Sequence, residues 1–216
     1  MVWTKIGVVI MLGGNEMGKM NTPEYILDIR KGKYSKTGAV TKILQECGIS
    51  EFPVNVWEIA RKLNFEVFDA TFTQANVSGM MIDALEVPPM LSKFNCKRAI
   101  ILNRNEPKNI QSFTVAHELG HFVYDCNEES NYYDALHTKD KQTLTEGERK
   151  QKEKEDQIDE FAAMLLMPET MFIQYINKSP NRYDRIALRA EMAKVCMVEE
   201  DAVDKRFDEL KIEFDK

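Results

Sequence analysis

The sequence predicts an α+β fold, in which a small sheet is followed by a helical remainder. The strand-like stretches lie between residues 65 and 103, and beyond residue 106 apolar side chains recur mainly at helical spacing. The 216 residues are 44% hydrophobic and 30% charged, which is typical of a globular protein that can bury a core without disulfide bonds. No apolar run approaches the roughly 20 residues that a membrane span requires, so we expect no membrane partner.

Two helices are expected before the sheet. The first covers residues 37–47, where apolar side chains recur at helical spacing, and Gly48 ends it. The second begins at Pro53, and its apolar positions are Val56, Ile59, Ala60 and Leu63.

Three strands follow, at Phe65–Phe72, Val77–Asp83 and Arg98–Asn103. A loop that contains Pro88 and Pro89 separates the second strand from the third, because proline interrupts the hydrogen bonding of a strand. The sheet is therefore expected to be small.

The second half of the chain is expected to be helical. One helix covers residues 106–124, and the polar stretch 125–143 predicts a loop. A long helix then runs from about residue 145 to Pro168, which ends it, and Pro180 separates the helix that follows from the last ones.

The cysteine usage and the charge balance suggest where the protein acts. Four cysteines occur without CxxC spacing and indicate free thiols in a reducing cytoplasm: Cys47, Cys96, Cys126 and Cys196. The N-terminal apolar stretch is short and lacks a cleavage-site pattern, so we expect no signal peptide. With 29 basic and 35 acidic residues the net charge is −6, which argues against a general binder of nucleic-acid backbones. We expect a cytoplasmic protein without direct nucleic-acid binding.

The sequence His117-Glu118-Leu119-Gly120-His121 is an HExxH motif within a predicted amphipathic helix. Side chains four residues apart emerge about 40° apart on one helix face, so both imidazoles can reach one zinc ion. Glu118 lies beside them, where a general base must sit. The chain has three histidines and two of them fall in this motif, which favours a zinc site over a chance occurrence. We predict that His117 and His121 bind zinc and that Glu118 is the catalytic base.

A catalytic zinc site needs a third protein ligand. The continuation of the motif that metzincins use is absent, because Tyr124 and Asn127 stand where its glycine and its third histidine would be. The third ligand must therefore come from another part of the chain.

The predicted long helix offers Glu155 and Asp159, an acidic pair four residues apart. One carboxylate can bind the metal, while the other accepts the ring N–H of a ligand histidine and fixes its orientation. The same stretch is also typical of a solvated charged face, and composition alone does not choose Glu155 over Glu153 or Glu160.

Two motifs carry a family resemblance: FTVAHELGH at residues 113–121, and ExxxDxFAAxLLMP beginning at Glu155. They resemble the ImmA/IrrE family of zinc metallopeptidases, which are gluzincin-like, and weaker similarity covers roughly residues 53–210. The resemblance implies one zinc ion per chain, with Glu155 as its third ligand. Asp159 would then be the carboxylate that contacts a ligand and does not bind the metal. Ile158 departs from the alanine of the family pattern, which leaves the ligands intact.

The resemblance also implies a minimal zincin-like fold, with a small mixed or antiparallel sheet packed on the HExxH helix and a helical C-terminal region. We divide the chain accordingly into three parts. Residues 1–35 are expected to form a flexible leader, residues 36–178 a zincin-like metallopeptidase domain, and residues 179–216 a helical extension packed on or beside it.

The function that the resemblance implies is zinc-dependent, intracellular hydrolysis of peptide bonds. Members of the family are associated with cleaving or inactivating helix-turn-helix repressors of phages, mobile elements and stress responses, so the expected partner is such a repressor. Two alternatives stay open: a non-catalytic regulatory or interaction protein that zinc stabilises, as in toxin–antitoxin or transcriptional control, and a general peptidase for short peptides. Structural zinc sites usually have four protein ligands, so three ligands beside Glu118 favour catalysis.

Substrate binding can be predicted only in outline. The strand at residues 77–83 is a candidate edge strand beside the motif helix and could hold an extended peptide by strand addition. Candidates for an oxyanion donor are Tyr132, Tyr133 and His137, although such residues are more typical of a surface loop. Cys126 follows the motif closely, and we interpret it as an idle thiol.

Overall fold

The computed structural model describes residues 22–72, 77–84, 86–124 and 146–214. It confirms the α+β fold. The helices are α1 (Glu24–Arg30), α2 (Lys36–Glu46), α3 (Val56–Lys62), α4 (Lys108–Tyr124), α5 (Glu146–Leu166), α6 (Glu169–Lys178), α7 (Arg185–Cys196) and α8 (Glu200–Glu209). The strands are β1 (Glu66–Ala70), β2 (Gly79–Asp83) and β3 (Arg98–Asn103), and η1 (Pro89–Phe94) is a short 3-10 helix. Among these residues no helix is both long and apolar enough to cross a membrane.

The sheet is mixed, with strand order β1-β3-β2. The central strand β3 is parallel to β1 and antiparallel to β2, and Ile101 of β3 pairs with Phe68 on one side and Met80 on the other. Ile100 and Leu102 face the main core, whereas Ala99 and Ile101 face a smaller core on the opposite side. Because both faces of β3 are covered, its sequence is a continuous apolar run instead of an alternating one.

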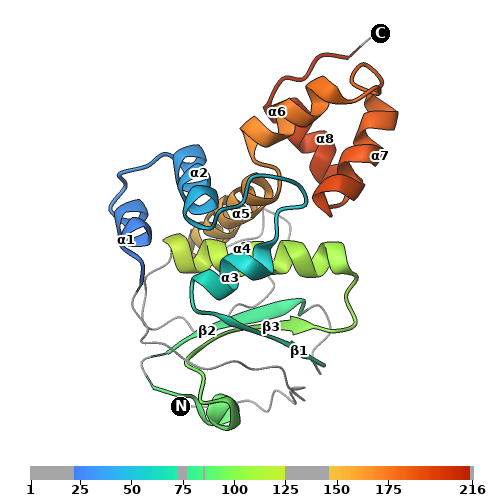
Figure 1. The fold of residues 1–216 in the computed structure, drawn as a ribbon. Helices are drawn as coiled ribbons and strands as arrows, with labels where there is room; N and C mark the ends of the chain where they lie inside the picture. Colours follow the sequence, from blue (N-terminus) through green and yellow to red (C-terminus); the bar gives the residue numbers. More distant parts are fainter. Residues whose placement is uncertain (1–21, 73–76, 85, 125–145, 215–216) are drawn as a thin grey trace.

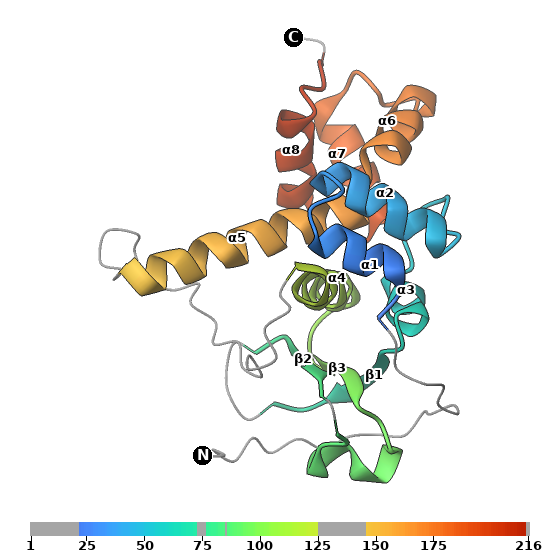
Figure 2. The same ribbon diagram turned by 90° about the vertical axis from the view of Figure 1, so that its left-hand side faces the viewer.

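The HExxH helix α4 crosses one face of the sheet, and η1 lies below the opposite face (Figures 1 and 2). Val115, Ala116 and Leu119 of α4 are buried in the main core against this sheet face. Helix α5 runs beside α4 on the side away from the sheet, and Phe161 and Leu165 bury its apolar face in the same core (Figure 2). These two helices therefore meet face to face, which positions the functional site between them.

Helix boundaries follow from local capping. The hydroxyl of Ser35 accepts a hydrogen bond from the backbone N–H of Gly38 and so begins α2. The helix expected to begin at Pro53 begins instead at Val56, because the side chain of Asn55 accepts from the N–H of Glu58 and caps it there.

Helix α1 lies within the stretch that we expected to be a flexible leader. Its Ile26 and Ile29 are buried, and the guanidinium of Arg30 lies 4.8 Å from the centre of the Phe122 ring of α4. The expectation of a flexible segment therefore does not hold for residues 24–30. Residues 1–21 are outside the described residues, and the division of the chain into three parts remains a prediction.

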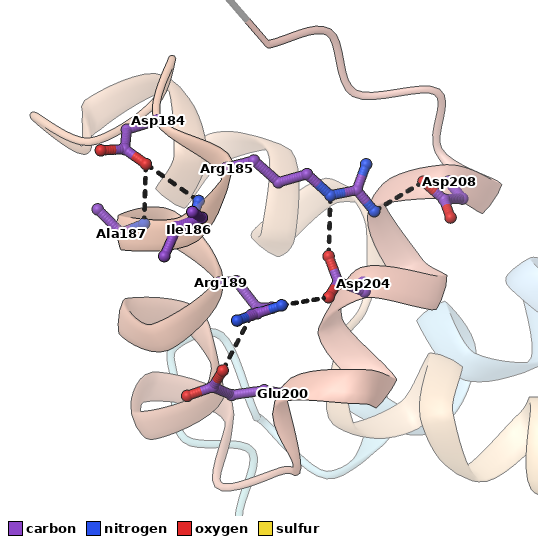
Figure 3. Close-up of polar contacts among 8 residues, drawn as sticks. All are labelled: Asp184, Arg185, Ile186, Ala187, Arg189, Glu200, Asp204 and Asp208. Atoms are coloured by element: carbon purple, nitrogen blue, oxygen red, sulfur yellow. Dashed lines mark hydrogen bonds and ion pairs between the residues drawn. The ribbon is translucent and has the colours of Figure 1, made fainter.

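Helices α6, α7 and α8 form a cluster beyond the C-terminal end of α5, on the side away from the sheet (Figure 1). Ion pairs join α7 to α8: Arg185 and Arg189 each contact Asp204 at 2.9 Å, and Arg189 also contacts Glu200 at 2.9 Å (Figure 3). The cluster is tied to α5 by Arg206 of α8, which donates to the carbonyl of Met167 at 3.1 Å.

Candidate metal centre

The two histidines of α4 point to the same place. His117 and His121 are one helical turn apart, and their Nε2 atoms lie 2.9 Å from each other. His121 is fully buried and His117 is half-buried, so the pair sits at the edge of the core. Two imidazole nitrogens this close can bind a single ion.

Glu155 of α5 completes a group of three ligand atoms. Its Oε2 lies 3.4 Å from Nε2 of His117 and 3.3 Å from Nε2 of His121. Tetrahedral ligands placed about 2.0–2.1 Å from a zinc ion would lie about 3.3 Å from one another. The spacing and the donor types of this group therefore fit zinc, and the structure brings together the three residues expected to bind it.

Two carboxylates weighed as alternatives lie away from this group. Glu153 is exposed, and Glu160 is exposed and forms an ion pair with Lys36 of α2. Only one face of α5 is turned toward α4, and this geometry separates Glu155 from its acidic neighbours.

Asp159 lies next to His117, on the side away from Glu155 and His121. Its Oδ1 is 2.7 Å from Nδ1 of the imidazole. Because a carboxylate can only accept, we assign one proton to Nδ1; the other ring nitrogen, Nε2, faces Glu155 and His121 and would offer its lone pair to a metal once its own proton is lost. Asp159 thus fixes both the tautomer and the orientation of His117.

Gln151 is a site residue that the sequence analysis missed. Its amide Nε2 donates to Oε1 of Glu155 at 2.8 Å, which leaves Oε2 for the two histidines. Gln151 precedes Glu155 by four residues on α5, so the helical spacing that paired Glu155 with Asp159 could have indicated it.

Glu118 lies beside the histidines in a buried position, with 4% of its surface exposed. Burial raises the pKa of its carboxyl group, and the nearby Glu155 raises it further. The two histidines and a backbone hydrogen bond from Met81 lower it, but burial outweighs them, so the pKa lies above the usual value. No described residue forms a hydrogen bond with its Oε2. A buried carboxylate oxygen without a partner is costly, which indicates a site for a polar ligand.

The electrostatics of the two ligands are coupled. Burial alone would lower the pKa of His117, but its hydrogen bonds to Asp159 and Glu155 outweigh this effect and raise the pKa to about 10. Burial alone would raise the pKa of Glu155, whereas its contacts with both histidines hold it well below the usual value. In the absence of an ion, His117 is therefore protonated and Glu155 ionised at neutral pH, and a cation that binds here would displace the proton from Nε2 of His117.

Gly120 allows α4 and α5 to approach closely at this point. A Cβ atom on Gly120 would lie 2.9 Å from Cγ2 of Ile158 and 3.0 Å from Cδ1 of Phe161. Ile158, the residue that departs from the family pattern, therefore packs against the motif helix and leaves the ligands in place.

Strand β2 is an edge strand of the described sheet and passes close to α4. A Cβ atom on Gly79 would lie 2.6 Å from Cγ2 of Thr114, so the start of β2 rests directly on the motif helix. Farther along β2, the backbone of Met81 hydrogen-bonds to Glu118. The edge considered for strand addition thus lies beside the expected catalytic base.

Four residues weighed in the sequence analysis lie outside the described part of the chain: Cys126, Tyr132, Tyr133 and His137. The other three cysteines are free thiols and are buried.

Comparisons with known proteins agree with this architecture. No curated protein matches the chain. The structure of a Mycobacterium tuberculosis transcriptional regulator is similar, with a TM-score of 0.51 and 13% identity over 86% of this chain and 50% of that one. This chain thus spans half the length of that regulator, and the likeness shows the fold alone.

The profile of the IrrE N-terminal-like domain family, Peptidase M78, matches residues 60–208, which is more than half of the chain. This range includes the HExxH helix, the helix that carries Glu155 and the C-terminal helices. The expected family is confirmed, and the chain belongs to the IrrE N-terminal-like, or ImmA/IrrE, family of metallopeptidases.

Proposed function

We propose that this protein is a zinc-dependent endopeptidase. The observation that carries the proposal is the convergence of His117, His121 and Glu155, whose ligand atoms lie within 4.8 Å of one another, beside the buried Glu118. These three residues would hold the zinc ion, which when bound lowers the pKa of water and polarises the carbonyl of the bond to be cleaved.

Glu118 would act as the general base and then as the general acid. It would take a proton from the attacking water and deliver it to the leaving amine. A raised pKa suits this double role, because the carboxyl group must both accept and release a proton near neutral pH. The partnerless Oε2 is the atom available for that proton.

Strand β2 would bind the peptide. Its free edge could pair with an extended substrate, which would bring the peptide backbone alongside Glu118. Asp159 and Gln151 would not touch the substrate bond; they would hold His117 and Glu155 in position.

The proposed substrate is a helix-turn-helix repressor of a phage or mobile element, and the proposed location is the cytoplasm. The support for this substrate is the family resemblance, since a fold and a site do not name a substrate. The alternative of a non-catalytic, zinc-stabilised regulator is less favoured, because the described residues supply three ligands rather than the four of a closed site.

The test compares the native chain with Glu118→Gln, each incubated with zinc and with the helix-turn-helix protein encoded beside its gene. We expect about one zinc ion per chain in both forms. Cleavage of the repressor should occur only with the native chain, as followed by mass spectrometry of the products. Equal cleavage by both forms would remove Glu118 from the mechanism, and a lack of zinc in the native form would contradict the proposed site.

A further inference from the structure

A cavity of about 510 Å³ lies beside the histidine–glutamate group, between α4, α5 and α8. Phe113 and Asp159 line the cavity, and both also lie next to His117. The ring centres of Phe113 and His117 are 6.4 Å apart, and Asp159 forms a hydrogen bond with Nδ1 of His117. The cavity therefore adjoins His117 on the side of Nδ1, the ring nitrogen that faces away from Glu155 and His121. The volume is within the range of ligand pockets, about 300–1,000 Å³.

The walls of the cavity carry apolar side chains from all three helices and the turn before α8. They are Ile110, Phe113, Ala163, Met167, Val198 and Ala202. An occupant must therefore offer apolar surface to these walls.

Acidic side chains outnumber basic ones in the same lining. The carboxylates are Asp156, Asp159, Glu160, Glu199, Asp201 and Glu209, against the two basic residues Lys205 and Arg206. Arg206 is already engaged, since it contacts Glu209 at 2.9 Å and donates to the Met167 carbonyl. Asp156, Asp159 and Glu160 are also paired, with Lys152, His117 and Lys36. Among the lining residues this leaves Glu199 and Asp201 against the single cation Lys205, so the occupant should bring positive charge.

The carboxylates near the start of α8 divide into two sets. Glu200 and Asp204 are turned toward α7 and are paired with its arginines (Figure 3). Glu199 and Asp201 line the cavity instead, are exposed, and pair with no cation among the described residues. The ion pairs with α7 thus hold α8 in place and leave two carboxylates to face a ligand.

We propose that this cavity receives a long basic side chain, arginine or lysine, of the peptide substrate. Such a side chain combines an apolar stem with a charged head, so the stem would lie along the apolar walls and the head would meet Glu199 and Asp201. The inference rests on the proposed peptidase function and adds a preference: the cleaved bond lies within one or two residues of a basic side chain.

The first experiment digests a library of synthetic peptides with the zinc-loaded full chain and identifies the cleaved bonds by mass spectrometry. We expect arginine and lysine to be enriched about tenfold at one position next to the cleaved bond. The double variant Glu199→Gln/Asp201→Asn should lose this enrichment, so that arginine and lysine occur at that position no more often than neutral residues.

The matched control is Glu86→Gln/Glu169→Gln. It removes two exposed carboxylates that lie outside the cavity lining, so it changes the net charge by the same amount. This control should keep the preference. Loss of the preference in both double variants would indicate a general effect of net charge and would overturn the inference.

The second experiment measures binding without cleavage, with zinc-loaded Glu118→Gln protein labelled for NMR. The probes are the peptide Ala-Ala-Arg-Leu-Ala-Ala and its counterpart with neutral citrulline in place of arginine. The arginine peptide should shift the amide signals of Val198 to Ala202 and bind about tenfold more tightly than the citrulline peptide.

The outcomes separate the two proposals. Cleavage without a basic preference would overturn this inference and leave the peptidase function intact. Absence of any cleavage would contradict the peptidase function, and the NMR titration would then decide whether the cavity binds basic side chains. Equal affinity for the arginine and citrulline peptides would overturn the inference in either case.

Discussion

Gln151 and Asp159 flank Glu155 on α5, one turn before it and one turn after it. Gln151 holds Oε1 of Glu155, while Asp159 holds Nδ1 of His117. One helix face therefore positions ligands on both helices. Residues that hold metal ligands typically change the affinity for the metal 10–100-fold when they are replaced.

Replacing Gln151 by alanine should weaken zinc binding by about tenfold, because Glu155 would lose the partner that keeps Oε2 turned toward the histidines. Competition with a chromophoric chelator measures this affinity directly. Gln157→Ala is the control, since Gln157 is exposed on the same helix. An unchanged affinity in Gln151→Ala would show that the hydrogen bond does not position the ligand.

At the scale of elements, the close contact of α4 with α5 depends on Gly120. An alanine there would force Ile158 or Phe161 to move, which should cost about 1–3 kcal/mol, partly offset by the better helix propensity of alanine. Thermal and urea unfolding measure this change. Gly147→Ala is the control, because a Cβ on Gly147 meets nothing within 4 Å, and it should be neutral or stabilising.

The same contact predicts coupling between Gly120 and Ile158. In the double variant Gly120→Ala/Ile158→Ala the new methyl group would occupy space that the isoleucine leaves, so the double variant should be about 1 kcal/mol more stable than the sum of the single changes. Additive effects in the unfolding measurements would show that the two residues do not crowd each other.

The ion pairs between α7 and α8 predict a dependence on pH. The hydrogen bond from Arg189 lowers the pKa of Asp204, and burial raises it. With the further hydrogen bond from Arg185, the pKa stays below its ordinary value of 3.8. Since the folded pKa is the lower one, the stabilisation by Asp204 is complete above that ordinary value and is lost as the pH falls through the folded pKa.

Asp204→Asn should therefore lower the unfolding temperature by roughly 2 °C at pH 7 and by less at pH 3. Calorimetry of both forms at the two pH values checks this difference. Asp201→Asn, on the same helix but without an ion pair to α7, should show a smaller effect at pH 7. A difference that grows toward pH 3 would contradict the assigned direction of the pKa.

At the scale of the whole molecule, the metal centre would link α4, which lies on the sheet, to α5, which leads to the cluster of α6, α7 and α8. His117 and His121 belong to α4, Glu155 belongs to α5, and Arg206 ties α8 to the end of α5. A ligand that binds only the folded state stabilises it by about 4 kcal/mol at a concentration 1,000 times its dissociation constant.

Zinc should therefore raise the unfolding temperature of the native chain, and removal of zinc with a chelator should reverse the change. Differential scanning calorimetry with and without zinc measures the effect. The His121→Ala variant should show little response to zinc, because it lacks one of the three ligands. An equal response of the native chain and the variant would place the stabilising zinc elsewhere.

The sequence by itself predicted the features that depend on local periodicity and on short motifs. Strand β3 begins and ends where the sequence predicted. His117 and His121 lie together because a helix places residues four apart on one face, and Glu118 lies beside them because it follows His117 directly. The buried helix α1 was missed, because seven residues in a stretch without a clear pattern give little periodic signal.

Contacts between distant elements were decided only by the tertiary structure. The residues alone did not distinguish Glu155 from Glu153 or Glu160, and the family resemblance made that choice; the packing of α5 on α4 turns Glu155 toward the histidines. The strand order, the hydrogen bond of Gln151 and the cavity walled by α8 likewise require elements to meet in space. The physical reason is that helical and strand periodicity fixes which face a residue occupies, whereas side-chain packing fixes what that face meets.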